Sequence, residues 1–253
     1  KAFSTGQIMV CLIVNGEKVR GTEALIKRLK TISGFTTLCL NINTSRGNTI
    51  LGQKTRVLYG PGVIIETICG ISFEISANAF FQVNPVQTEV LYEKVLEFAD
   101  LHGTENVWDL YCGTGTISLS LAEKAGKVHG VEIVPQAVEN ARRNAERNGL
   151  SNAEFFLGKA EEVLPQHVRE NPDDKISCIV VDPPRKGCDR GLLDTILEAS
   201  PDRLIYVSCD SATLARDLKI LAEGGYLPRV IQPVDMFPHT VGVETVVQLS
   251  KGN

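Results

Sequence analysis

The chain has 253 residues, of which 43% are hydrophobic and 22% are charged, and its formal net charge is −4. These values predict a globular protein with one large domain or two smaller ones, and no apolar run is long enough to span a membrane. Seven scattered cysteines without C-x-x-C pairs argue against a zinc site or a disulfide framework. We therefore expect a cytoplasmic protein, in a reducing compartment, that binds no metal.

The charge is distributed unevenly along the chain. Residues 1–84 carry 9 Lys and Arg against 4 Asp and Glu, a net charge of +5, whereas residues 85–253 carry 17 against 26, a net charge of −9. A basic front segment joined to an acidic body indicates contact with a polyanion. The basic residues are dispersed, however, and a chance imbalance on a small domain explains them equally well.

Residues 1–84 predict a small α+β subdomain. Apolar and β-branched runs indicate strands, and Thr22 is a candidate cap for a helix whose apolar residues recur at helical spacing. The predicted strands are residues 8–14, 35–42, 63–68 and 71–75, and the apolar helix positions are Leu25, Ile26, Leu29 and Ile32.

Residues 85–253 alternate between strand and helix patterns, which implies a mainly parallel sheet with helices on both faces. Two last strands, at 228–234 and 243–249, have no helical pattern between them and suggest an antiparallel pair at one edge. The other predicted strands are 107–111, 128–131, 155–157, 176–181 and 204–207, and the helices are 85–98, 117–124, 135–148 and one after residue 210.

A loop with two glycines, Gly113 and Gly115, follows the first of these strands and opens a helix. Glycines there let the backbone approach a ligand closely, and Glu132 at the end of the next strand can accept hydrogen bonds from both hydroxyls of a ribose. A dinucleotide fingerprint would place a third glycine at position 118, which is a serine. The pattern favours S-adenosylmethionine over NAD, with a solvated surface acid as the alternative interpretation of Glu132.

Two more strand ends carry reactive groups. Asp182 is followed by Pro183, Pro184 and Arg185, so a rigid carboxylate there can position a cofactor or an extruded base, or the prolines can simply form a turn. Cys209 follows the strand 204–207 and precedes a helix start, which favours the thiolate. A small buried hydrophobic residue is the alternative for this cysteine.

These motifs, with Phe80–Asn84 and with Asp235–Thr240 followed by Val243-Glu244, resemble the S-adenosylmethionine-dependent RNA uracil-5 methyltransferases. That family makes 5-methyluridine in tRNA and rRNA. The resemblance runs from about Phe80 to the C-terminus, and residues 1–84 resemble the family's central subdomain more loosely. It implies an α/β fold, with a class I methyltransferase Rossmann-like domain over residues 85–253. The family often has an N-terminal TRAM domain, and some members hold an iron–sulfur cluster. Neither is recognised in this sequence, which fits either a missing upstream part or a minimal member of the family.

The resemblance also implies roles for individual residues. Cys209 would be the nucleophile and Glu244 the general base. The cofactor would be held by Gln82, Tyr111, Gly113, Gly115, Glu132 and Asp182. Two positions depart from the family pattern: Asp210-Ser211 replaces a common Asn-Pro, and Gly242 replaces a common histidine. Phe237 or His239 could stack on the target base.

We therefore expect a monomeric RNA methyltransferase, without membrane association, that methylates C5 of a uridine in rRNA or tRNA through a covalent cysteine–C6 adduct. RNA cytosine-5 methylation uses the same addition, but that family usually has a cysteine where this chain has Pro184. A catalytically inactive RNA-binding relative would not need both Cys209 and Glu244. Both alternatives remain open from the sequence.

Overall fold

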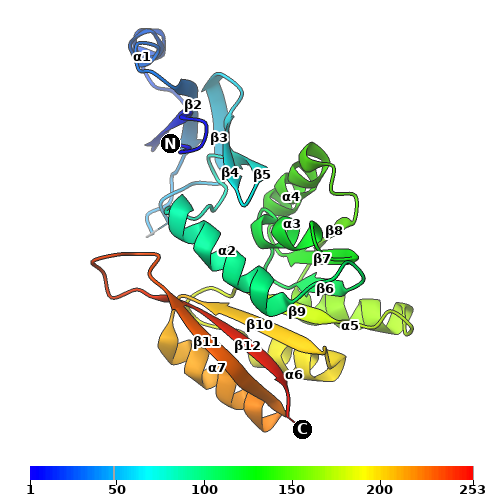
Figure 1. Cartoon of the computed structure of the whole chain (residues 1–253). Helices are drawn as coiled ribbons and strands as arrows, with labels where there is room; N and C mark the ends of the chain where they lie inside the picture. The colour runs from blue at the N-terminus through cyan, green and yellow to red at the C-terminus, as the bar shows by residue number, and fades with distance from the viewer. Residues whose placement is uncertain (48, 253) are drawn as a thin grey trace. The chain divides into compact units, whose positions relative to one another are not determined.

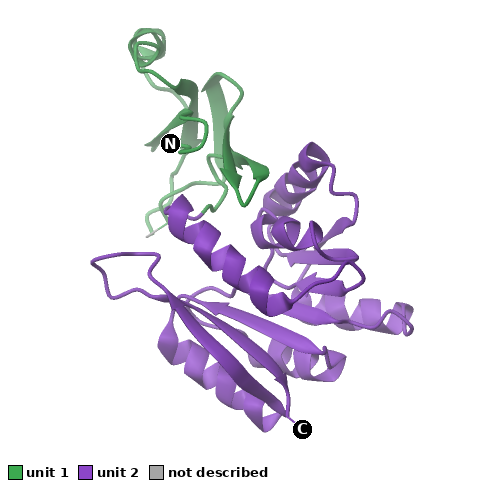
Figure 2. Ribbon diagram, viewed as in Figure 1, with its two compact units in different colours: residues 1–81 green, residues 82–253 purple. Residues whose placement is uncertain are grey.

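The computed structural model describes residues 1–47 and 49–252, and the chain divides into two compact units, residues 1–81 and 82–253 (Figure 2). The boundary precedes the predicted one because residues 82–84 lead into the first helix of unit 2. The Asn84 side chain accepts a hydrogen bond from the Gln87 amide at 3.3 Å and donates one to the Met236 carbonyl at 3.2 Å. None of the described helices is long and apolar enough to cross a membrane.

Unit 1 contains a three-stranded sheet and a separate hairpin. In the sheet, of order β1-β2-β3, β1 and β2 are parallel and are connected through α1, and β3 is antiparallel to β2. Gly21, rather than Thr22, precedes the helix, in a left-handed conformation, and β3 was not predicted. The elements are β1 (Ile8–Val14), α1 (Thr22–Leu29), β2 (Phe35–Ile42), β3 (Lys54–Tyr59) and the β4 (Val63–Ile68) and β5 (Ile71–Ser76) hairpin.

Unit 2 alternates strands and helices as the sequence predicts, with two helices, α5 and α6, that were not predicted. Its elements are α2 (Pro85–Ala99), β6 (Asn106–Asp109), α3 (Thr116–Ala122), β7 (Lys127–Glu132), α4 (Pro135–Asn148), β8 (Ala153–Leu157), α5 (Ala160–Glu170), β9 (Cys178–Val181), α6 (Arg190–Ala199), β10 (Arg203–Ser208), α7 (Ser211–Glu223), β11 (Tyr226–Val234) and β12 (Glu244–Lys251) (Figure 1).

These strands form one seven-stranded sheet of order β11-β12-β10-β9-β6-β7-β8. The five strands β10, β9, β6, β7 and β8 are parallel to one another. Strand β12 is antiparallel to both of its neighbours, β10 and β11. The predicted fold class, a class I methyltransferase Rossmann-like sheet with an antiparallel edge pair, is confirmed. The chain reverses its direction of winding between β6 and β9, and ligands of such sheets bind at this switch point, beyond the carboxyl ends of the strands.

Helices cover both faces of the sheet (Figure 1). Helices α2, α3 and α4 contact one another in sequence on one face, and α5, α6 and α7 do so on the other. The core against the second layer is built on fully buried large side chains, among them Trp108, Tyr206 and Leu164. Burial of such side chains stabilises the unit by about 1.5–3 kcal/mol each. Packing on the buried face holds the strands in place. The loops at their carboxyl ends are not part of this core and can therefore form a binding site.

Gly130 on β7 provides a test of this packing. A Cβ added there would lie 2.6 Å from Phe155 Cδ1 and 3.0 Å from Cys112 Cβ. We expect Gly130→Ala to lower the free energy of unfolding of unit 2 by about 1–3 kcal/mol, because overpacking forces neighbours apart. Urea unfolding followed by the fluorescence of Trp108, the single tryptophan, measures it.

The matched control is Gly191→Ala in α6, where an added Cβ meets nothing within 4 Å. Replacing glycine by alanine in a helix raises the free energy of unfolding by about 0.5–1 kcal/mol. Equal unfolding midpoints for the two variants would contradict the account of packing around β7.

Candidate active site

Ionisable side chains gather at the carboxyl edge of the parallel strands. Asp109 ends β6 and Glu132 ends β7, while Asp182 directly follows β9 and Cys209 directly follows β10. Glu244 begins β12, which runs in the opposite direction, so its start lies at the same edge. The sheet topology thus brings together four acids and a thiol from residues 109 to 244.

Asp109 holds the glycine loop and the start of α3 through hydrogen bonds. Its buried carboxylate accepts a hydrogen bond from the Ser118 hydroxyl at 2.6 Å and a longer one from the Tyr111 amide at 3.4 Å. Burial raises the pKa of Asp109 to about 6, and the nearby charge of Glu132 adds to this, while the Ser118 bond opposes it. Asp109 was not among the site residues predicted from the sequence, although its position at a strand end was visible.

Glu132 is fixed beside the glycine loop by backbone donors. Its carboxylate accepts hydrogen bonds from the Gly113 amide at 3.2 Å and from the Val134 amide at 2.8 Å, and the residue remains partly exposed. An ionised carboxylate offers about four acceptor positions, so it keeps acceptor capacity for ligand hydroxyls. Glu132 is therefore an oriented acceptor rather than a free surface acid.

The two predicted glycines differ in their surroundings. Both have positive φ, 54° at Gly113 and 84° at Gly115. A Cβ at Gly115 would lie 3.1 Å from both Ala141 and Phe155, so close packing explains that glycine, whereas a Cβ at Gly113 would meet nothing within 4 Å. Gly113 is thus needed for the turn itself and faces open space, where a ligand could approach the backbone.

Cys209 and Glu244 are neighbours through strand pairing. In the antiparallel pairing of β10 and β12, Ser208 lies opposite Thr245, so the next residue of one strand and the preceding residue of the other face each other. Glu244 is 4% exposed, whereas Cys209 keeps part of its surface accessible. Burial raises the pKa of the Glu244 carboxyl, and the Arg185 guanidinium opposes this shift. A carboxylate with a raised pKa is a stronger proton acceptor than an ordinary one.

The expectation that the helix start favours the Cys209 thiolate is wrong for the free chain. Burial raises the pKa of this thiol, and the charges of Glu244 and Asp182 raise it further, although Arg185 lowers it. A backbone hydrogen bond at Cys209 also lowers it, while the Asp210 side chain accepts hydrogen bonds from the Ala212 and Thr213 amides at the start of α7, both at 3.0 Å. Burial and the two neighbouring carboxylates therefore outweigh the groups that favour the thiolate.

Asp182 and Arg185 bring opposite charges to the same edge. Burial raises the pKa of Asp182 to about 7, and the charges of Glu244 and Asp109 contribute. Arg185 is exposed and lies close enough to lower the pKa values of both Cys209 and Glu244. From the sequence, Arg185 was only part of a motif and was not identified as the cation of the site.

A buried carboxylate, Asp217 of α7, ties the Asp182 loop to the helix that follows Cys209. It accepts hydrogen bonds from the Tyr206 hydroxyl at 2.6 Å and from the Cys188 amide at 2.8 Å. It also pairs with Arg216, whose guanidinium donates to the Lys186 carbonyl at 2.9 Å. The loop after β9 and the start of α7 are therefore held as one body, which sequence spacing did not indicate.

The last two predicted cofactor residues are Tyr111 and Gln82. Tyr111 follows Leu110 in the glycine loop, packs against the core, and its hydroxyl interacts with the thiol of Cys188, which together with burial raises the pKa of the phenol. Gln82 is partly buried at the start of unit 2, two residues before Asn84, which binds the loop that precedes Glu244. The structure thus brings seven of the eight predicted residues to the carboxyl edge of the sheet or to the loops that follow it, whereas Gln82 lies at the start of unit 2.

The electrostatic coupling of Cys209 to Glu244 gives a prediction. We expect Glu244→Gln to lower the pKa of the Cys209 thiol, because removal of a neighbouring negative charge stabilises the thiolate. The pH dependence of iodoacetamide alkylation at Cys209, followed by peptide mass spectrometry, should shift to lower pH. The control Glu223→Gln, at the far end of α7, should leave the profile unchanged. A profile that stays in place or moves to higher pH in Glu244→Gln would contradict the proximity of Glu244 to Cys209.

Comparison with known proteins adds to this geometry. A protein of Halalkalibacterium halodurans named as an uncharacterized RNA methyltransferase is 52% identical over 251 residues, covering 99% of this chain and 54% of the relative. One from Clostridium acetobutylicum is 51% identical over 252 residues, with 99% and 54% covered. The chain spans about half the length of these curated relatives.

A crystal structure of Pyrococcus abyssi tRNA (uracil-54, C5)-methyltransferase in complex with S-adenosyl-L-homocysteine superposes with a TM-score of 0.81 at 29% identity. The match covers 98% of this chain and 58% of that one. The family model of the tRNA (uracil-5-)-methyltransferases matches residues 68–252, which is more than half of the chain. Because the family model matches most of the chain and the fold agrees with that of the Pyrococcus abyssi enzyme, the chain belongs to the tRNA (uracil-5-)-methyltransferase family.

Proposed function

We propose that this chain is the catalytic part of an RNA methyltransferase that transfers a methyl group from S-adenosylmethionine to C5 of a uridine through a covalent adduct with Cys209. The observation that carries the proposal is the pairing of β10 with β12, which sets a partly exposed thiol beside a buried carboxylate of raised pKa. Family membership and the similarity to the Pyrococcus abyssi tRNA (uracil-54, C5)-methyltransferase support uridine C5 as the target and tRNA as the first substrate to test, with rRNA second.

The carboxyl edge of the sheet suits S-adenosylmethionine. Glu132 is oriented beside the open space at Gly113 and can accept hydrogen bonds from ribose hydroxyls. Asp182 and Asp109 add negative charge, which favours a ligand that carries a sulfonium and an ammonium group. Gly115, Tyr111 and Gln82 complete the proposed cofactor set. Gly115 allows the tight turn into α3, and Tyr111 lies in the same loop. Gln82 is included because the family resemblance implies it.

In the proposed mechanism the partly exposed Cys209 thiol releases its proton to solvent, against burial and the charges of Glu244 and Asp182, so that Glu244 stays unprotonated for the later step. The sulfur then adds to C6 of uracil, and the electron pair of the C5–C6 double bond makes C5 nucleophilic. When bound, S-adenosylmethionine would supply an electrophilic methyl group to C5, and S-adenosylhomocysteine would leave with the electron pair of the broken sulfur–methyl bond. Arg185 lowers the pKa of the thiol and so favours its attacking form.

Proton removal completes the reaction. After methylation C5 carries both the new methyl group and its original proton. Glu244 accepts that proton, the C5–C6 double bond forms again, and the sulfur of Cys209 leaves C6. General base catalysis of this kind contributes roughly 10²–10⁴-fold to a rate. The buried position of Glu244 raises its pKa, which suits it to accept a proton from carbon.

Uracil in a folded RNA must be extruded from its stack before Cys209 can reach C6, at a cost of a few kcal/mol. His239, in the loop between β11 and β12, is exposed and has a φ of 66°, which few residues other than glycine adopt. Phe237 lies two residues earlier in the same loop and is partly exposed. These rings are the proposed stacking partners of the extruded base, and the basic residues 1–84 are the proposed phosphate contacts.

The covalent step is tested by separating addition from elimination. We expect Glu244→Gln to add to C6 and to transfer the methyl group, but to retain the C5 proton, so that a methylated protein–RNA adduct accumulates. Cys209→Ala should abolish both adduct and product. A denaturing gel with labelled RNA and S-adenosylmethionine detects the adduct, and nucleoside mass spectrometry of the parent reaction distinguishes 5-methyluridine from 5-methylcytidine.

Two controls make the result decisive. The double variant Cys209→Ala with Glu244→Gln should form no adduct. Calorimetric titration should show that Cys209→Ala still binds S-adenosylhomocysteine, whereas Glu132→Ala should bind it more weakly by about 1–3 kcal/mol. An adduct that persists without Cys209, or full turnover by Glu244→Gln, would refute the assigned roles. A 5-methylcytidine product would favour the cytosine-5 reaction, and cofactor binding without any product would favour an inactive relative.

A further inference from the structure

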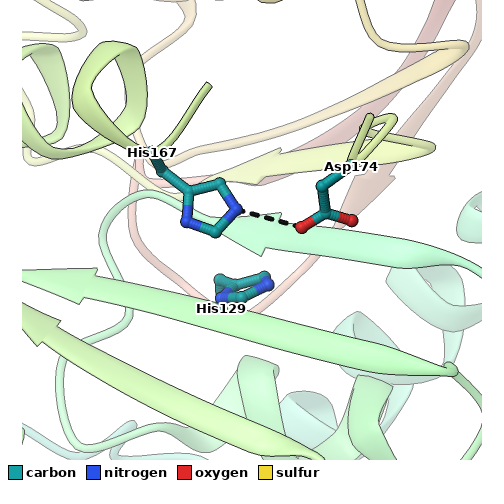
Figure 3. Close-up of side chains that lie close together, drawn as sticks. All are labelled: His129, His167 and Asp174. Atoms are coloured by element: carbon teal, nitrogen blue, oxygen red, sulfur yellow. Dashed lines mark hydrogen bonds and ion pairs between the residues drawn. The ribbon is translucent and has the colours of Figure 1, made fainter. Parts of the chain in front are cut away.

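Three ligand-bearing side chains meet away from the candidate active site, beneath α5. His129 lies on β7, His167 lies in the last turn of α5, and Asp174 lies in the segment between α5 and β9 (Figure 3). One nitrogen of each imidazole and one carboxylate oxygen all lie within 4.8 Å of one another. His167 Nε2 and Asp174 Oδ2 are 3.0 Å apart and form a hydrogen bond, with the His129 ring beside them.

His129 is the unexplained member of this cluster. Its side chain is fully buried, and neither ring nitrogen has a hydrogen-bond partner among the described residues. Its Nδ1 lies 3.8 Å from the Glu154 carboxylate, which is beyond hydrogen-bond distance. A neutral imidazole has one nitrogen lone pair, and a buried polar atom left unpaired is costly. The same form, with an available lone pair, is the one that binds metal ions.

The surrounding residues hold the cluster in place. The Asn106 side chain donates a hydrogen bond to the second oxygen of Asp174 at 2.9 Å. Trp108 stacks on the His129 ring at a centroid distance of 4.5 Å and meets the His167 ring edge-on at 4.7 Å. Ligating carboxylates in metal sites are usually hydrogen-bonded by a neighbouring residue, as Asp174 is by Asn106.

We propose that His129, His167 and Asp174 bind a divalent transition-metal ion of the Zn²⁺ type. Two imidazole nitrogens and one carboxylate oxygen are a common zinc ligand set, with water in the fourth position. Tetrahedral ligands at zinc distances lie about 3.3 Å apart, so the three groups need to close by a small movement only. The side chains of His167 and Asp174 are 13% and 34% exposed, which gives the ion a path from solvent.

This site is separate from the carboxyl edge and has a structural consequence. His129 precedes Glu132 by three residues on β7, so their side chains point to opposite faces of the sheet. The ion would join β7, the end of α5 and the segment that leads to β9, and would thereby stabilise that side of unit 2. No metal was expected from the sequence because that expectation rested on cysteine spacing, and these ligands are dispersed from residue 129 to residue 174.

The test uses the whole 253-residue chain, freed of metal with a chelator. Titration with Co²⁺ should produce the visible absorption of a tetrahedral site with nitrogen and oxygen ligands, at one ion per chain. Paramagnetic Co²⁺ should quench the fluorescence of Trp108, the single tryptophan, because it stacks on a ligand. Competition with a chromogenic chelator then gives the Zn²⁺ affinity, and Zn²⁺ should raise the melting temperature.

The partly exposed ligands give variants that should fold. We expect His167→Gln and Asp174→Asn each to weaken Zn²⁺ binding at least tenfold and to lose the Co²⁺ quenching and the thermal shift. The matched control is His102→Gln, which removes a histidine 3.9 Å from Asp100 on the surface, and it should behave like the parent. Circular dichroism verifies the fold of each variant.

Three results would overturn the proposal. The first is a parent chain that binds no metal, which would mean that a buried water satisfies His129. The second is equal affinity in the parent and in the His167 and Asp174 variants. The third is a thiolate-to-cobalt charge-transfer band that iodoacetamide removes, which would assign the binding to cysteines.

Discussion

The antiparallel pairing of β12 with β10 is the constraint on which the candidate site depends. Parallel strands alone would bring the residues after β6, β7, β9 and β10 to one edge, but they would supply no strand that begins there. Because β12 runs in the opposite direction, its first residue, Glu244, meets the residue that follows β10. A thiol and a carboxylate from positions 35 residues apart in the sequence thus face each other across paired strands. The proposed addition and elimination require that geometry.

The second feature of the site is its excess of negative charge. The folded chain raises the pKa of Asp109 from 3.8 to about 6 and that of Asp182 from 3.8 to about 7. A carboxyl with a higher pKa in the folded than in the unfolded state retains its proton longer, so its ionisation costs folding stability as the pH rises from about 4 to 7. A cationic ligand would offset that cost. This arrangement explains how the same edge can suppress the thiolate in the free chain and favour a sulfonium-bearing cofactor.

The sequence predicted the architecture of unit 2 well because alternation of strands and helices is a local signal. The edge pair was predictable for the same reason, since residues 235–243 show no helical pattern. Helix α5 was not predicted; it contains Pro165, which is unfavourable inside a helix. In unit 1, β3 has an exposed face with charged residues, and its weak apolar pattern hid it.

Within the site, residues at strand ends could be predicted, whereas their interactions could not. Cys209, Glu132 and Asp182 follow apolar runs that are visible in the sequence. The direction of the Cys209 pKa shift was predicted wrongly, because it depends on burial in the folded chain and on charges from β12 and from the loop after β9. The same is true of Asp217, which joins two segments by hydrogen bonds to Tyr206 and Cys188. Such contacts between distant segments leave no spacing pattern to read.

The central claim, that the thiol at the end of β10 attacks the base, is tested most directly with RNA that contains 5-fluorouridine. Fluorine at C5 cannot leave as a proton does, so a base cannot complete the elimination, and the unmodified chain should remain attached to the RNA after methyl transfer. Nuclease digestion, proteolysis and mass spectrometry should find a peptide that carries a methylated fluorouridine on Cys209. Attachment to another residue, or no covalent complex although the chain turns over the normal uridine substrate, would contradict the account.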